Sequence, residues 1–179
     1  MNEKSKKQIS KFLSLVLRHQ PEKVGLMLDP RGWANVSDIL EKSELKFTFQ
    51  QLEEIVETND KQRFCFNQDK TKIRANQGHS LKTVDLDLRP KVPPVFLYHG
   101  TIAKFIPQIE QSGLKKMSRQ HVHMSQDRDT AIKVGSRRGK PMILRIRALD
   151  MHIQNFPFFL SENGVWLTDE VPSTFIDFE

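Results

Sequence analysis

The sequence is poor in cysteine and lacks long apolar runs. Its 179 residues include one cysteine, Cys65, so no disulfide can form within the chain, and such scarcity is typical of a reducing compartment. No apolar run approaches the roughly 20 residues that cross a bilayer, and segment 1–8 is too polar for a signal peptide. We therefore expect a cytoplasmic protein without membrane contact, with Cys65 packed in a strand.

Three common signatures of enzyme sites are also absent. There is no Gly-x-x-x-x-Gly-Lys-Ser/Thr motif, which excludes a P-loop for phosphate binding. There is no Gly-x-Gly-x-x-Gly motif, which argues against a Rossmann dinucleotide site. No pair of carboxylates stands out as an acid and base couple. Any nucleotide or phosphate chemistry must therefore use other residues.

The composition favours a folded and basic protein. Hydrophobic residues make up 37% and charged residues 28%, and the net charge is +6. The charge is uneven, because residues 93–160 hold eleven Lys and Arg against four Asp and Glu, while residues 161–179 hold five acids and no base. A basic surface attracts phosphate-rich partners through counterion release. The alternative is a soluble protein that happens to be basic.

The N-terminal part shows helix signals followed by a hairpin. Apolar residues at helical spacing predict a helix over 5–18, which ends before Pro21. Shorter helices are predicted over 37–43 and after Thr48, where Gln51 completes capping-box spacing. Strands are predicted at 63–66 and 72–75, joined by a polar turn. Helices followed by a β-hairpin favour a winged-helix lobe over residues 1–80.

The C-terminal part alternates strands with helices. Residues 81–94 show no clean period and end in a proline cluster, so we interpret them as a linker. Over 95–179 the patterns predict strands at 95–98, 122–125 and 142–147 and helices at 103–111 and 127–134. Asn163-Gly164 between two apolar stretches predicts a hairpin turn. The predicted fold class is α+β in two lobes, the second being β-rich.

Three sets of residues in the first 80 positions could carry chemistry. Arg18 and His19 lie at the end of the first predicted helix, where a guanidinium can grip phosphate and an imidazole can donate or move a proton. Cations at a helix C-terminus are also favoured by the dipole alone. Arg74 shares a strand face with Lys72, either toward a ligand or toward solvent. The glycine of Gly78-His79-Ser80 would allow close approach of a ligand.

Further candidates lie in the second lobe. His99, Gly100 and Thr101 follow the strand at 95–98, where side chains could donate to a ribose or a carboxamide; an ordinary strand-to-helix turn is the alternative. In segment 118–125, Arg119 could bind phosphate while the histidines and Ser125 orient a nucleotide. His99, His121 and His123 could imitate a zinc site, but the nearby arginine would repel a cation, so we expect no metal.

Two more features have a functional and a structural interpretation. Residues 135–140 are basic and glycine-flanked, so Arg138 could contact a pyrophosphate or RNA, or the segment could be a solvated loop. Trp166 could stack on a base, although an aromatic residue of this size is more often part of a core. The segments themselves do not decide between these interpretations.

Five short motifs, taken in order, are specific together. They are Leu13-Ser14-x-x-Leu17-Arg18-His19, Ile73-Arg74-Ala75-x-x-Gly78-His79-Ser80, Leu97-Tyr98-His99-Gly100-Thr101, Ser118-Arg119-x-His121-Val122-His123 and Gly164-Val165-Trp166-Leu167. Their order and spacing, from residue 13 to about 168, resemble the tRNA 2′-phosphotransferase family. The resemblance implies a C-terminal ADP-ribosyltransferase-like lobe that binds NAD, beside a winged-helix lobe.

The resemblance also implies an activity and a set of site residues. The activity is NAD-dependent transfer of an internal RNA 2′-phosphate to ADP-ribose, as in tRNA splicing and processing, with release of nicotinamide and ADP-ribose 1″,2″-cyclic phosphate through a 2′-phospho-ADP-ribosylated RNA. Arg18, His19, Arg74 and Arg119 would bind the RNA phosphate in a cleft between the lobes. The implied NAD-binding residues are His99, Gly100, Thr101, Ser125 and Arg138.

Two other hypotheses fit part of the sequence. A winged-helix nucleic-acid binder without catalysis would explain the charge and the hairpin, but not the arginine motifs in both lobes. An ADP-ribosyltransferase acting on protein or on nucleic-acid phosphates would need a catalytic glutamate near the last strands, where Glu162 in the predicted turn is the only candidate. The expected partners are RNA and NAD, and nothing in the sequence indicates an obligate dimer, so we expect a monomer.

Overall fold

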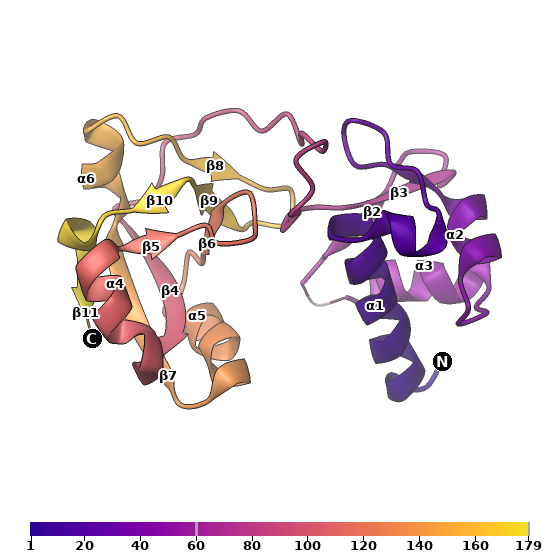
Figure 1. Cartoon of the computed structure of the whole chain (residues 1–179), viewed down its shortest axis with the longest axis horizontal. Coiled ribbons are helices and arrows are strands. Elements are labelled where there is room, and N and C mark those ends of the chain that lie inside the picture. Colours follow the sequence, from indigo (N-terminus) through magenta and orange to yellow (C-terminus); the bar gives the residue numbers. More distant parts are fainter. Residues whose placement is uncertain (60, 179) are drawn as a thin grey trace. The chain divides into compact units, whose positions relative to one another are not determined.

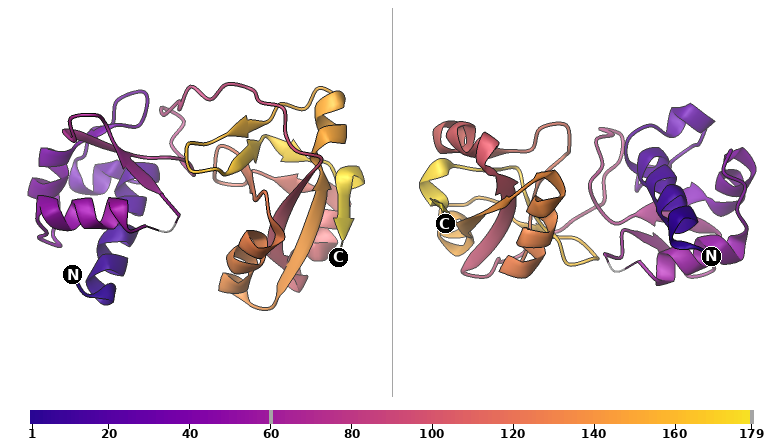
Figure 2. Two further views of the ribbon diagram at one scale, coloured as in Figure 1. Left: turned by 180° about the vertical axis from the view of Figure 1, so that it is seen from behind. Right: turned by 90° about the horizontal axis from the view of Figure 1, so that it is seen from below.

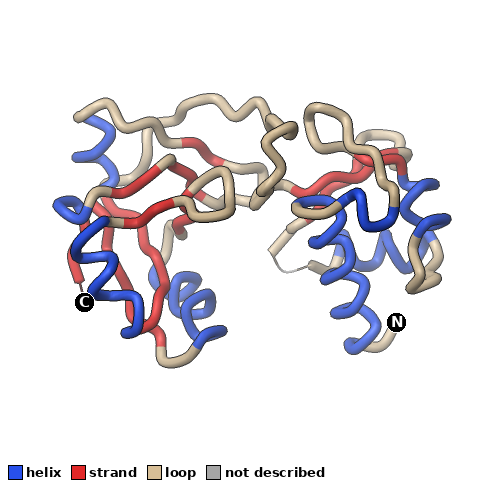
Figure 3. Tube along the Cα trace, viewed as in Figure 1, coloured by secondary structure: helices blue, strands red, loops and turns tan. Residues whose placement is uncertain are grey.

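The computed structural model describes residues 1–59 and 61–178 and divides into two compact units, residues 1–87 and 88–179 (Figure 1). Both units mix helices with small sheets, and every strand pair in the described part of the chain is antiparallel (Figure 3). The architecture agrees with the α+β prediction at this level. Within the described residues, no helix combines the length and the apolar character needed to span a membrane.

The first unit packs three helices against a three-stranded sheet. The helices are α1 (Glu3–Arg18), α2 (Val36–Lys42) and α3 (Phe49–Glu57), with a 3₁₀ turn η1 (Pro21–Val24). The strands are β1 (Ala34–Asn35), β2 (Phe64–Phe66) and β3 (Lys72–Ala75), with β3 in the centre. The core is formed by one apolar face of each helix and the inward side of the sheet, including Leu13, Leu17, Leu52, Phe64 and Ile73.

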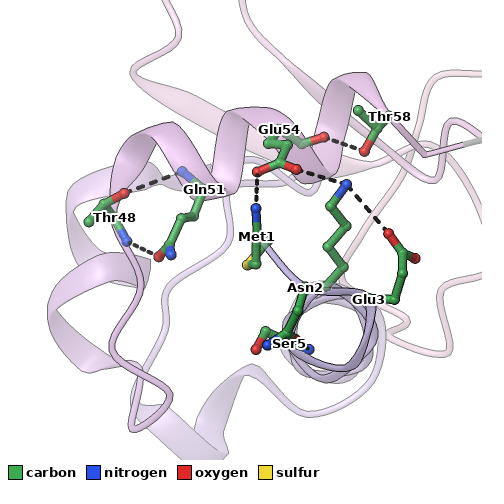
Figure 4. Close-up of polar contacts among 9 residues, drawn as sticks. Met1, Asn2, Glu3, Ser5, Thr48, Gln51, Glu54 and Thr58 are labelled. Atoms are coloured by element: carbon green, nitrogen blue, oxygen red, sulfur yellow. Dashed lines mark hydrogen bonds and ion pairs between the residues drawn. The ribbon is translucent and has the colours of Figure 1, made fainter.

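Local sequence signals explain where two helices begin (Figure 4). At α1, the side chain of Asn2 accepts a hydrogen bond from the Ser5 amide. At α3, Thr48 and Gln51 form the predicted capping box, because each side chain accepts a hydrogen bond from the other residue's amide. Each cap satisfies amides that have no partner within the helix. The helix starts could therefore be predicted from a few neighbouring residues.

Residues 81–87 fold onto the first unit. Val84 is buried, and the amide of Asp85 donates to the Pro30 carbonyl at 2.8 Å. The two contacts attach this segment to the loop that precedes β1. The segment therefore takes part in the packing of residues 1–87.

The second unit holds three small sheets and three helices. The strands are β4 (Phe96–Ile102), β5 (Leu114–Lys115), β6 (Val122–Met124), β7 (Pro141–Arg147), β8 (Phe159–Leu160), β9 (Trp166–Thr168), β10 (Glu170–Val171) and β11 (Ile176–Phe178). Their orders are β11-β7-β4, β6-β9-β8 and β10-β5. The helices are α4 (Ile106–Ser112), α5 (Arg128–Gly135) and α6 (Ala148–Ile153), with 3₁₀ turns η2 (Ala103–Phe105), η3 (Ser136–Arg138) and η4 (Ser173–Phe175).

The long pair β4 and β7 corrects one prediction. His99, Gly100 and Thr101 were expected at the end of a strand, but β4 continues through them to Ile102. Their partners in β7 are Leu144, Ile143 and Met142, so all three are paired within the ladder. Gly100 fits within the strand because α5 packs directly against it, and an added Cβ would meet the backbone of Ala131. Figure 2 shows α5 alongside the pair β4 and β7.

The hairpin between β8 and β9 is confirmed. The two strands pair antiparallel, the Ser161 amide donates to the Val165 carbonyl at 3.0 Å, and Gly164 has φ +75°. A positive φ is easy for glycine and strained for most other residues. Trp166, at the start of β9, is buried in the core of the second unit. Its large apolar ring therefore contributes to packing.

Candidate active-site residues in the two units

The end of α1 holds Arg18 in a buried position. Only 7% of Arg18 is exposed, which is unusual for an arginine. Its Nη2 donates to the Arg63 carbonyl at 3.4 Å, and its guanidinium carbon lies 5.7 Å from the centre of the Phe64 ring. These contacts come from β2 and the residue before it. The charge is thus held in place by the sheet as well as by the helix.

The turn after β3 binds the end of α1. The Ser80 amide donates to the Arg18 carbonyl at 3.0 Å, and the Ser80 hydroxyl shares a 3.0 Å hydrogen bond with Nδ1 of His19. Gly78 adopts φ +88° and lies beside the Arg18 guanidinium. The predicted site motifs of α1 and of Gly78-His79-Ser80 therefore come together in the first unit. In the sequence, these two motifs lie about 60 residues apart.

Arg74 joins this group from the middle strand. It projects from the sheet face opposite Ile73 and Ala75, which are both fully buried. Its guanidinium carbon lies 4.5 Å from the centre of the Trp33 ring. An arginine over an indole is held by cation–π attraction, which fixes the plane of the guanidinium group. Trp33 was not among the predicted site residues.

His79 lies at the centre of these cations. It is 1% exposed, and neither ring nitrogen has a hydrogen-bond partner in the part of the chain that the structure describes. Burial, followed by the charges of Arg18, His19 and Arg74, lowers the pKa of His79 to about 4. The ring is therefore neutral at pH 7. Positive charges gathered around a neutral ring are suited to an added anion.

In the second unit, His99 is oriented by a backbone carbonyl. Its Nδ1 lies 2.9 Å from the carbonyl oxygen of His123. A carbonyl only accepts, so Nδ1 carries the hydrogen and Nε2 can accept from a ligand when the ring is neutral. Burial is the main cause that lowers the pKa of His99; the hydrogen bond to His123 opposes it, and the nearby Arg138 and Arg119 lower it further.

Arg119 and Arg138 form a second concentration of positive charge. Arg119 precedes β6, and its Nη1 donates to Nδ1 of His123 at 3.0 Å. Arg138 belongs to η3, after α5. Desolvation and then the like charge of Arg138 lower the pKa of Arg119, although an arginine stays charged at neutral pH. The charged groups that lower the pKa values of His99 and Arg119 are arginines. This concentration of positive charge suits a phosphate-bearing ligand.

The remaining candidates differ in their surroundings. Thr101 is 8% exposed, and Ser125 lies beside β4 because its backbone exchanges two hydrogen bonds with Tyr98, at 2.8 and 2.9 Å. Gly100 packs against α5, where an ideal Cβ would lie 1.9 Å from the Ala131 carbonyl oxygen. The glycine is therefore required by helix packing on that side.

The histidines of the possible zinc site have other contacts. The His121 ring packs against Phe159, with centroids 5.6 Å apart. Nδ1 of His99 and Nδ1 of His123 are engaged by a carbonyl and by Arg119. Residues 1–59 and 61–178 contain no group of three His, Cys, Asp or Glu arranged to hold a metal ion.

Each unit thus holds arginines close to a histidine whose pKa is lowered. Positive charge concentrated in this way suits a phosphate-bearing ligand. The sequence matches the model of the RNA 2′-phosphotransferase, Tpt1/KptA family over residues 4–170. Because this match covers most of the chain, the protein belongs to that family, which is a family of transferases.

Curated relatives match over nearly all of their lengths. A probable RNA 2′-phosphotransferase of Flavobacterium johnsoniae is 57% identical over 182 aligned positions, covering 100% of both chains. Proteins described in the same words from Fusobacterium nucleatum and Pectobacterium carotovorum are 52% and 51% identical. These matches cover 96% and 94% of this chain and 97% and 92% of the relatives.

Proposed function

We propose that this protein is an NAD-dependent RNA 2′-phosphotransferase, which moves an internal RNA 2′-phosphate to ADP-ribose. The observation that carries the proposal is the arrangement at the end of α1, where Ser80 bonds to His19, Gly78 lies beside the Arg18 guanidinium, and the neighbouring strand holds Arg74 over Trp33. A dianionic phosphate on RNA is a ligand that such a cluster would bind. Family membership supports the phosphate transfer, and the use of NAD is an inference from the resemblance of the motifs.

We assign the two units different substrates. Arg18, His19 and Arg74 of a winged-helix-like first unit would bind the 2′-phosphate, with Arg119 of the second unit acting on the same group. His99, Gly100, Thr101, Ser125 and Arg138 of an ADP-ribosyltransferase-like second unit would bind NAD. The neutral His99 supports this, because its Nε2 can accept a hydrogen bond from a ribose hydroxyl. Arg138 would pair with the pyrophosphate.

The first chemical step needs orientation more than acid or base catalysis. An oxygen of the 2′-phosphate forms a bond to the ribose carbon that carries nicotinamide, and the bond from that carbon to nicotinamide breaks. The attacking oxygen is already an anion, so no proton has to be removed. Holding phosphate and ribose together makes the reaction effectively unimolecular. The product is 2′-phospho-ADP-ribosylated RNA and free nicotinamide.

The second step requires the protein to stabilise more negative charge than the first step does. The ribose 2″-hydroxyl attacks phosphorus, the bond from phosphorus to the RNA 2′-oxygen breaks, and a proton passes overall from the attacking hydroxyl to the leaving oxygen. Negative charge grows on the phosphoryl oxygens, where Arg74 and Arg119 would stabilise it. His19, whose Nδ1 bonds to Ser80, is suited to donate a hydrogen bond or to transfer the proton.

The test uses a short RNA with one internal 2′-phosphate, incubated with the protein with and without NAD. We expect loss of the phosphate only with NAD, together with nicotinamide and ADP-ribose 1″,2″-cyclic phosphate in equal amounts. A product that keeps ADP-ribose would indicate an ADP-ribosyltransferase instead. RNA that binds but stays unchanged in the presence of NAD would indicate a binding protein.

A further inference from the structure

Two hydrogen bonds from different residues meet at His123, in the middle of β6. Its backbone carbonyl accepts from Nδ1 of His99, and its ring Nδ1 accepts from Nη1 of Arg119. A guanidinium can only donate, so this ring is neutral with its hydrogen on Nε2. One residue therefore contacts both the histidine assigned to NAD and an arginine assigned to phosphate.

The contact matters most for Arg119. This residue lies in the turn before β6 and is exposed as a whole, although its guanidinium is partly desolvated. A free arginine side chain carries about 2 kcal/mol of rotamer entropy, which would have to be lost on binding phosphate. His123 is part of a paired strand, where it lies opposite Leu167 of β9. The strand can therefore hold the guanidinium in place before the substrate arrives.

Resting on the proposed function, we infer that His123 is a positioning residue that orients Arg119 through its ring and His99 through its carbonyl. The two roles are separable by mutation, because a side-chain change removes the bond to Arg119 but keeps the backbone bond to His99. A change at the ring should thus weaken phosphate chemistry while the affinity for NAD is preserved.

The variants His123→Ala and His123→Asn test this division. The alanine variant loses the acceptor, whereas the Oδ1 of asparagine can take the place of Nδ1. A hydrogen bond to a charged group contributes roughly 1.5–3 kcal/mol, so kcat should fall about tenfold to hundredfold in His123→Ala. The KM for NAD should change less than about twofold, and His123→Asn should recover most of the rate. His152→Ala, in α6 of the same unit, is the control.

Two results would overturn the inference: a His123→Ala variant with unchanged kcat, or one whose KM for NAD rises as much as kcat falls. A second measurement does not need activity. The imidazole nitrogen resonances of His123 should report an unprotonated Nδ1 that shifts on Arg119→Ala, and no shift would contradict the contact. An inactive wild type would refute the proposed function, while the resonances would still decide whether the contact forms.

A separate observation concerns the exposed side of α1. Lys4, Lys7 and Lys11 lie at spacings of three and four residues, so they share one helix face, opposite buried residues such as Leu13. The buried Arg18 follows seven residues later on the same side of the helix. The three lysines are exposed and form no ion pair within the described residues. The only acid of α1, Glu3, contacts Lys6 instead. The face therefore carries positive charge without a local counterion from the protein.

We infer that this lysine face binds the backbone phosphates of the RNA next to the 2′-phosphorylated nucleotide, which deepens the proposed function. From Lys4 to Arg18 the helix rises about 21 Å. The face ends at Arg18, a residue assigned to the 2′-phosphate. An RNA strand held along it would have its modified nucleotide at that end. Contacts to backbone phosphates carry no sequence information, so the surface should accept RNA of any sequence.

The test compares Lys7→Gln/Lys11→Gln with Lys23→Gln/Lys46→Gln, which removes the same charge from other exposed positions of the first unit. Binding of a 2′-phosphorylated decanucleotide is measured without NAD over a series of salt concentrations. The first double variant should flatten the dependence of log Kd on log salt by about 1.4, at roughly 0.7 for each lost phosphate contact. Equal flattening in the control, or none in the α1 variant, would overturn the assignment.

Discussion

Gly100 of β4 lies directly against the backbone of Ala131 in α5. A Cβ on Gly100 would lie 1.9 Å from the Ala131 carbonyl oxygen, so no side chain fits without moving the helix. This packing brings η3, and with it Arg138, close behind the strand that carries His99. A residue assigned to NAD binding is thus also a requirement for folding.

We predict that Gly100→Ala lowers the free energy of unfolding by at least about 2 kcal/mol, because overpacking displaces backbone rather than a flexible side chain. Urea denaturation measures the change. Gly164→Ala is the control, since its φ is +75° but nothing lies within 4 Å of the added Cβ. It should cost only about 1 kcal/mol of backbone strain. Equal losses would show that the contact with α5 is not the cause.

Removal of Arg74 or Arg119 should impair the second chemical step more than the first. Loss of one donor that stabilises developing charge typically reduces a rate by about 100- to 1,000-fold. We therefore expect Arg74→Ala and Arg119→Ala to accumulate 2′-phospho-ADP-ribosylated RNA. Rapid-quench measurements of nicotinamide release and of RNA dephosphorylation separate the steps. Equal slowing of both would contradict this division of roles.

The ring of Trp33 should matter through Arg74. Its cation–π contact, with the guanidinium carbon 4.5 Å from the ring centre, is worth about 0.5–2 kcal/mol. Trp33→Leu should therefore slow the second step roughly 2- to 30-fold, and Trp33→Phe should lose less because an aromatic face remains. The comparison is made at saturating RNA. If leucine and phenylalanine have the same effect, the contact does not position Arg74.

Burial of His79 should make stability depend on pH. Its pKa is about 4 in the folded protein and 6.5 in the unfolded chain, so between these values the unfolded chain binds the extra proton. The contribution of the neutral His79 ring to the free energy of unfolding is complete above pH 6.5. On the order of 3 kcal/mol of this free energy is lost as the pH falls toward 4. Denaturation of wild type and His79→Leu between pH 7 and 4 measures it. The variant should show a smaller fall, and parallel curves would contradict the assignment.

The elements with local signals were predictable. The apolar spacing in α1, the capping box of α3 and the Asn163-Gly164 hairpin each depend on residues a few positions apart. The prediction for β4 was wrong at its end, because the length of β4 depends on pairing with β7, about 40 positions later. Only the packing of α5 against β4 shows why this strand contains a glycine.

The sequence by itself determined the family, through five motifs whose order and spacing are hard to obtain by chance. It also determined which arginines and histidines to consider, since their chemistry depends on residue type. Only the tertiary structure decided that His79 is buried among Arg18, His19 and Arg74, that Trp33 faces Arg74, and that His123 contacts both His99 and Arg119. Burial and charge at a side chain are set by neighbours distant in sequence, which a linear pattern does not specify.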